Sequence, residues 1–114
     1  MKRKRLQKVN EEIRRILSDV LLFDMKDPRI NGIVSITHVD TAADLKSAKV
    51  YVSCLNGELQ EDELIEILRR AKGYFRRRLG EKLELYHTPE VLFYYDDSIA
   101  KAMEMDELFK KLNP

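Results

Sequence analysis

The chain has 114 residues, of which 44% are hydrophobic, and its formal net charge is +1. This length suits one domain with one core, and the composition excludes the intrinsically disordered class. No apolar run approaches the roughly 18 residues of a membrane span. The basic start leads into charged residues rather than the apolar core of a signal peptide, so we expect a cytoplasmic protein with no membrane contact.

Basic and acidic residues are segregated along the chain, although they nearly cancel in the net charge. Acidic residues gather between positions 58 and 66 and again between positions 96 and 107. The first basic stretch contains Lys2, Arg3, Lys4, Arg5 and Lys8, and the second contains Arg69, Arg70, Lys72, Arg76, Arg77, Arg78 and Lys82. Separated patches of this kind can attract a polyanion to one face of a protein even when the total charge is small.

The first predicted element is a long amphipathic helix. Its apolar residues recur at spacings of three and four, which gives one buried stripe. The stripe contains Leu6, Val9, Ile13, Ile16, Leu17, Val20 and Leu21. The helix is expected to run to Asp27-Pro28, because proline cannot continue the hydrogen-bond ladder.

Two strands follow, one at residues 33–40, which are rich in β-branched side chains, and one at residues 47–55. In the second strand Ala48, Val50, Val52 and Cys54 alternate with Lys49, Tyr51, Ser53 and Leu55. Their short polar connection predicts an antiparallel hairpin with one face packed on helices and the other more open. Cys54, the lone cysteine, is interpreted as a buried small hydrophobic residue.

A second helical pattern starts near Gln60 and continues to about Leu83. Its apolar stripe consists of Leu64, Ile67, Leu68, Ala71, Phe75 and Leu79. Gly73 interrupts the pattern and costs about 1 kcal/mol relative to alanine in a helix interior, so a kink is expected there. Residues 91–95 predict a third strand, and Ser98 is expected to cap a last short helix. The order predicts an α+β fold in which helices cover one face of a three-stranded mixed sheet.

The residues that usually carry catalysis or bind metals show no supporting pattern. His38 and His87 lie on different elements with no second ligand at metal-binding spacing. The serines lack a nucleophile motif, and the glycines are too dispersed for a phosphate-binding loop. We interpret Asp96-Asp97 as a strand end and helix start rather than a magnesium site. We therefore expect no enzyme activity, no catalytic residue, no metal and no cofactor.

The second basic stretch carries the functional hypothesis. Arginine and lysine bind phosphates, and a helix that restarts after a kink offers further N–H donors. Tyr74 lies among these residues and could stack on a base. The segment therefore favours contact with RNA, and the alternative is a solvated helix face paired with nearby acidic residues.

Four segments in this order and spacing make the chain resemble the ribosome-binding factor A family almost end to end. They are residues 26–30 (Lys-Asp-Pro-Arg-Ile), 44–53 (Asp-Leu-Lys-Ser-Ala-Lys-Val-Tyr-Val-Ser), 71–80 (Ala-Lys-Gly-Tyr-Phe-Arg-Arg-Arg-Leu-Gly) and 88–93 (Thr-Pro-Glu-Val-Leu-Phe), with 97–99 and 106–108 beyond them. The resemblance implies a type II KH-like domain over residues 1–98, followed by a short helix or tail over residues 99–114. In place of the usual Gly-x-x-Gly clamp, it implies a structural kink formed by Ala71 and Gly73.

The resemblance also implies a function in ribosome biogenesis. Members bind free small (30S) subunits, assist late assembly and maturation of the 5′ end of 16S rRNA, and matter in cold adaptation. We expect the basic residues to hold helices of the decoding region as a placeholder, with the protein acting as a monomer. Two alternatives stay open: a general KH-like module that binds RNA or DNA without ribosome specificity, and a protein-interaction domain.

Overall fold

The computed structural model describes residues 3–113, so Lys2 of the first basic stretch lies outside the described residues. The fold begins with α1 (Arg3–Asp19), which buries Val9, Ile13, Ile16 and Leu17 of the predicted stripe. The helix then widens into one π-helical segment, η1 (Val20–Asp24), and the chain becomes extended at Met25. The prediction that the helix runs to Asp27 was wrong. The helical hydrogen bonds end with the π-helical turn at Asp24, three residues before the position that precedes Pro28.

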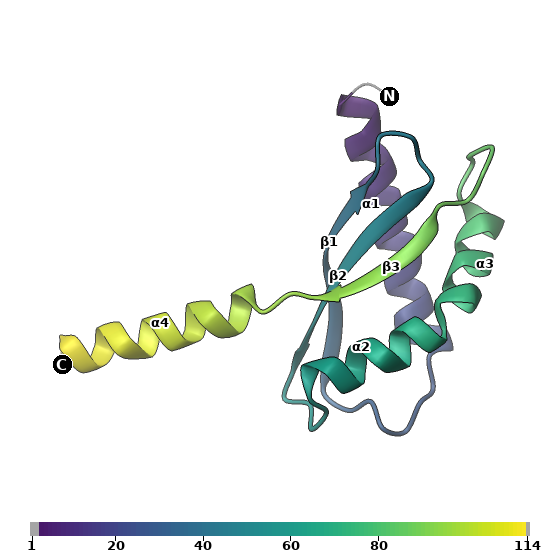
Figure 1. The fold of residues 1–114 in the computed structure, drawn as a ribbon. Helices are drawn as coiled ribbons and strands as arrows, with labels where there is room; N and C mark the ends of the chain where they lie inside the picture. Colours follow the sequence, from purple (N-terminus) through teal and green to yellow (C-terminus); the bar gives the residue numbers. More distant parts are fainter. Residues whose placement is uncertain (1–2, 114) are drawn as a thin grey trace.

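A three-stranded mixed sheet forms the layer on which the helices pack (Figure 1). β1 (Ile33–Thr41) and β2 (Ser47–Leu55) pair antiparallel, and β3 (Glu90–Tyr95) lies parallel to β2 on its other side. The sheet residues that pack into the core are Ile36, Val39, Ala48, Val50, Val52, Val91 and Phe93. The predicted mixed sheet with its hairpin and single covered face is confirmed.

Two side chains of β2 depart from the predicted alternation of burial. Ser53, expected on the more open face, is buried, and its hydroxyl oxygen lies 3.4 Å from that of Ser35. Cys54, expected in the core, is only half-buried, and its sulfur lies 3.5 Å from the carbonyl oxygen of Asn31. Near the end of β2, the burial of a side chain therefore depends on contacts with the neighbouring strand and loop as well as on the alternation of the strand.

A β-bulge interrupts the pairing of β1 with β2 between Ile36 and His38. Thr37 has no opposite residue in the register, and its hydroxyl donates to Asp96 at 2.6 Å. Such an extra residue reverses the alternation of side chains beyond it. The bulge therefore allows Val39 to enter the core while His38 points to the opposite face.

The second helical pattern forms two helices that meet at one residue. α2 (Glu61–Arg70) begins with a capping box between Gln60 and Glu63, which satisfies backbone donors in its first turn. α3 (Lys72–Lys82) follows after Ala71. Both helices pack on β3, and α3 also packs on α1. The predicted order of helix, two strands, kinked helix pair and strand is thus observed.

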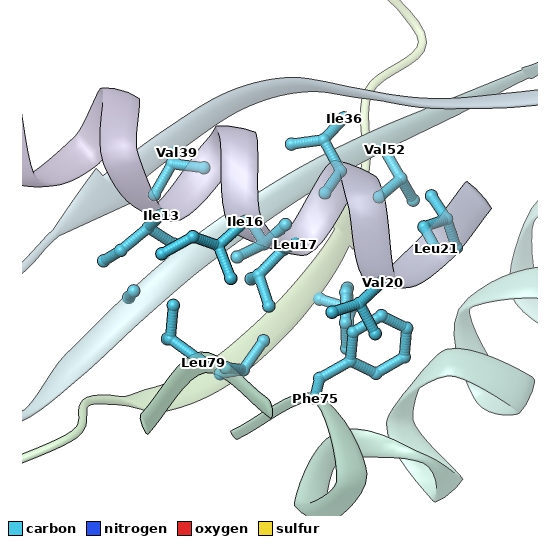
Figure 2. Packing of buried hydrophobic residues seen from close by; sticks show 14 of the residues in the cluster. Ile13, Ile16, Leu17, Val20, Leu21, Ile36, Val39, Val52, Phe75 and Leu79 are labelled. Carbon is cyan, nitrogen blue, oxygen red and sulfur yellow. The ribbon is translucent and has the colours of Figure 1, made fainter. Parts of the chain in front are cut away.

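The core lies between α1, the helix pair and the sheet. Figure 2 shows Phe75 beside Val20, and Leu79 facing Ile13 and Leu17. Phe75 is fully buried, and its ring meets that of Phe93 edge to face with the centroids 5.0 Å apart. The side chains of α3 therefore join α1 to the edge strand of the sheet.

The last helix, α4 (Ser98–Leu112), extends away from the sheet and has no buried residue (Figure 1). Its N-cap is Asp97 rather than Ser98, so the predicted cap was wrong. The N–H of Ser98 instead donates to the carboxylate of Asp96 at 3.0 Å. The division of the chain at residue 98 stays a prediction.

We expect Phe75→Ala to lower the free energy of unfolding by about 3–5 kcal/mol, because it leaves a cavity between α1 and β3. Tyr86→Ala is the matched control, since that ring is 95% exposed and its removal should change stability by less than about 0.5 kcal/mol. Urea unfolding followed by circular dichroism measures both. Similar decreases in the two variants would contradict the packing described for Phe75.

Candidate nucleic-acid interface

The break between α2 and α3 is at Ala71, two residues before the glycine that suggested it. Ala71 has φ −94° and ψ 6°, outside the regular helix. Its N–H donates to the carbonyl of Leu68 at 3.1 Å, and its own carbonyl accepts from Phe75 at 3.1 Å. The helix therefore tightens for one residue and restarts at once, so the kink falls within the predicted Ala-x-Gly segment.

Gly73 is in the first turn of α3 with helical dihedral angles, so the turn does not need a glycine. A Cβ atom built on Gly73 would meet none of the described residues within 4 Å apart from its two chain neighbours and the backbone of its own helix. The backbone at this position is therefore open on its outer side. An approaching group, such as a phosphate, can come closer to a bare Cα than to a side chain.

An open groove of about 480 Å³ runs beside this bare backbone. Its lining residues are Gly73, Arg76, Arg77, Gly80, His87 and Thr88. His87 and Thr88 belong to the loop before β3, and this loop folds back onto α3. This loop was not predicted as part of the site, because no local pattern of residues indicates that positions 87 and 88 return to the helix.

The three consecutive arginines of α3 point in three directions. The guanidinium of Arg76 donates to the carbonyl of Thr88 at 2.9 and 3.1 Å, which holds the loop against the helix. Arg77 lies over the ring of Tyr74, 5.2 Å from its centroid. Arg78 turns to the other side and donates to Asp24 at 3.0 Å. Successive helical residues are about 100° apart, so one basic run cannot present a single flat surface.

Asp24 connects the end of η1 to α3. Its carboxylate accepts hydrogen bonds from the Tyr74 hydroxyl at 2.7 Å and from Arg78 at 3.0 Å. The hydrogen bond from Tyr74, followed by that from Arg78, lowers the pKa of Asp24 below its usual 3.8. The same contact raises the pKa of Tyr74. The hydroxyl of Tyr74 is thus engaged within the protein, while its ring stays 40% exposed.

The basic residues around the break are also distributed over different surfaces. Arg70 pairs with Glu66 on the outer side of α2 at 2.7 Å. Arg69 reaches the edge of β3, where it donates to the carbonyl of Phe93 at 3.1 Å. The Nζ atom of Lys72 lies 3.9 Å from a carboxylate oxygen of Glu90. Among the described residues, no carboxylate lies within ion-pair distance of the Lys82 ammonium group.

The N-terminal basic residues lie on the helix that packs beside α3. Arg3, Lys4, Arg5 and Lys8 are all exposed on α1. Figure 1 shows α1 and α3 running in opposite directions, so the start of α1 is at the same end of the molecule as the end of α3. The structure therefore brings the two basic stretches to neighbouring helices of one layer, a relation that the sequence left open.

Within residues 3–113, no group of three His, Cys, Asp or Glu side chains is arranged to hold a metal ion. No helix of that range is long and apolar enough to span a membrane. On the helical side, the features suited to binding are the groove beside Gly73, the surrounding cations and the exposed ring of Tyr74.

Comparison with known proteins identifies relatives over almost the whole chain. The family model described as Ribosome-binding factor A matches residues 5–109. A ribosome-binding factor A from Halothermothrix orenii is 43% identical over 112 residues, which cover 98% of this chain and 91% of that protein. One from Clostridioides difficile is 44% identical over 109 residues, covering 96% and 85%.

Solved structures share the fold. A Thermotoga maritima protein studied by solution NMR superposes with a TM-score of 0.74 at 35% identity, covering 86% of this chain and 92% of that one. A Thermus thermophilus ribosome binding factor A, a homology model fitted into the cryo-EM map of a 30S complex, superposes with a TM-score of 0.64 at 19% identity, covering 77% and 91%.

We expect Asp24→Asn to destabilise the protein at pH 7, because the substitution removes the charge that Arg78 contacts. The carboxylate has a lowered pKa in the folded state, so its contribution is fully present above pH 3.8 and is lost as the pH falls through the folded pKa. Urea unfolding at pH 7 and near pH 2.5 should show a difference between the parent and the variant that shrinks in acid. A difference that is constant with pH would contradict the ion pair.

We expect Gly73→Ala to raise the free energy of unfolding by up to about 1 kcal/mol, because alanine favours the helix and meets no neighbour there. Gly80→Ala is the matched control in the same helix. Its Cβ would lie 2.8 Å from the Thr88 hydroxyl oxygen, which should reduce or abolish the gain. Thermal unfolding compares the two variants, and a decrease in the stability of Gly73→Ala would contradict the open position.

Proposed function

Because the chain belongs to the ribosome-binding factor A family, we propose that it binds free small (30S) ribosomal subunits and assists their late assembly. The proposal includes maturation of the 5′ end of 16S rRNA and a requirement in cold adaptation. The protein acts in the cytoplasm as a monomer and performs no catalytic step. It leaves the subunit before translation begins.

The observation that carries this proposal is the groove in which bare backbone and cations meet. Gly73 leaves the start of α3 open, and Arg76 and Arg77 line the same groove. Guanidinium groups bind phosphates through paired N–H donors, and the first turn of a helix favours an anion. A sugar-phosphate backbone of rRNA fits this combination.

In mechanism, the protein acts as a placeholder on the rRNA. Phosphate contacts position a protein without reading a base sequence. Arg77 and Lys82 are the leading contact residues, because Arg76 and Arg78 already have partners that fix their directions. Arg3, Lys4, Arg5 and Lys8 on the adjacent helix extend the contact. Together they hold a helix of the decoding region in an immature position until the protein leaves.

Co-sedimentation with small subunits, large subunits and complete ribosomes across a salt series tests the proposal. We expect selective binding to small subunits that weakens as salt rises, since phosphate contacts release counterions. Equal binding to all three particles would leave a general nucleic-acid-binding module. Absence of binding to each of them would direct the search to protein partners.

We expect the double substitution Arg76→Glu and Arg77→Glu to weaken binding to small subunits about tenfold or more. It should also reduce the slope of log affinity against log salt by about 1, the unit that belongs to the phosphate Arg77 no longer neutralises, because Arg76 mainly holds the loop before β3. Lys110→Glu with Lys111→Glu is the matched control, because it makes the same charge change on α4, far from the groove. Equal effects of the two pairs would contradict a specific contact at α3.

A further inference from the structure

The sheet face that points away from α1, α2 and α3 carries a row of three rings, one from each strand. His38 of β1 lies opposite Tyr51 of β2, and Tyr51 lies opposite Tyr94 of β3. The centroids of each neighbouring pair of rings are 5.7 Å apart, with tilts of 38° and 31° between the ring planes. The rings therefore cross the whole width of the sheet in direct cross-strand register.

The β-bulge at Thr37 is what completes this row. Ile36 points into the core, so strict alternation would also send residue 38 into the core. The extra residue shifts the register, and His38 becomes exposed opposite Tyr51. Thr37 is held in place by its hydrogen bond to Asp96. Bulges commonly redirect one side chain at a binding site.

A cation completes the row at the free edge of the sheet. Arg69 comes around β3 from the helical side, and its guanidinium lies 5.7 Å from the centroid of the Tyr94 ring. Its hydrogen bond to the carbonyl of Phe93 fixes this position. The row therefore runs from an imidazole through two phenol rings to a guanidinium, and each of these four groups has a flat face suited to stacking.

The rings are accessible and do not fully cover one another. Tyr94 is 38% exposed, and His38 is exposed as well. Centroid separations of 5.7 Å with tilted planes are those of offset rings, so part of each face stays uncovered. Such platforms on a sheet bind unpaired bases.

The surroundings of the row favour a nucleic acid over an apolar protein surface. Ser35, Asp40 and Lys49 lie on the same face, and Leu92 is half-buried. Lys49 is opposite Asp40 in the register, which offsets that acidic residue. Asp96 is engaged by Thr37 and by the N–H of Ser98. Arg69 then supplies a positive charge beside the last ring for a backbone phosphate.

We propose that the row formed by His38, Tyr51 and Tyr94 binds unpaired nucleotides of RNA by stacking, with Arg69 contacting their backbone. This inference rests on the proposed function, and it adds a second contact on the face opposite α1 and α3. The helical side holds phosphates, whereas the sheet side holds bases. A segment of single-stranded rRNA is the ligand that the row takes.

Binding of fluorescently labelled hexauridylate and hexaadenylate to the full chain tests the inference. Tyr51→Leu should weaken binding at least about fivefold, because the base stacked on the central ring loses its aromatic partner. Tyr51→Phe keeps the ring and should bind like the parent. Phe109→Leu removes an aromatic side chain that is 58% exposed on α4 and should also leave affinity unchanged. In NMR spectra, the ring protons of Tyr51 and Tyr94 should shift when RNA is added.

The inference is overturned if the parent binds neither oligonucleotide, or if Tyr51→Leu binds both as well as the parent does. Circular dichroism verifies the fold of each variant. If Tyr51→Leu does not fold, Tyr94→Leu on the edge strand provides the same comparison. Small-subunit binding that still depends on Arg76 and Arg77, with RNA affinity insensitive to Tyr51, would overturn the stacking row and leave the proposed function intact.

Discussion

The break at Ala71 is the constraint on which the rest of the structure depends. Leu64, Leu68, Phe75 and Leu79 fall within roughly 60° of one another at 100° per residue, so their apolar stripe keeps its phase across the break. The break therefore bends the helix axis without turning the buried face outward. α2 can then cover β3 while α3 reaches both β3 and α1. A straight helix of 22 residues would extend about 33 Å and would carry one end of the stripe away from this core.

The same bend decides what the basic residues can do. Arg69 is directed around the edge of β3, Arg76 is held by the loop before that strand, and Arg78 is held by Asp24. In these contacts the charged side chains hold neighbouring elements of the protein in position. Arg77 and Lys82 remain as the cations of this run with the fewest hydrogen bonds and ion pairs inside the protein. A surface that binds phosphates thus depends less on the number of arginines in the run than on which of them the tertiary contacts leave available.

The helical layer and the open sheet face differ in chemistry, and the difference follows from the elements that form them. Helices present long cationic side chains at several angles, which suits a charged backbone that curves past them. Strands place residues opposite one another at a fixed spacing, which suits a row of rings. Arg69 is common to both surfaces, because it begins on α2 and ends over Tyr94. Besides the break at Ala71, the π-helical segment and the β-bulge are local irregularities that each direct one side chain (Asp24 and His38) toward its partner.

The strands, the buried stripes and the region of the kink could be predicted from the amino-acid sequence, because each depends on neighbours within a few residues along the chain. The mixed sheet was predicted from the order of these elements. Periodicity is a local property, and the core positions of α1, β2 and the helix pair follow from it. The packing of the elements settled that the break falls at Ala71 rather than Gly73, that Ser53 is buried, and that His38 joins the aromatic row. It also settled where each arginine points, since Asp24 and Thr88 are 54 and 12 residues from their partners Arg78 and Arg76. Such pairings depend on how separate elements pack, which no local pattern of residues encodes.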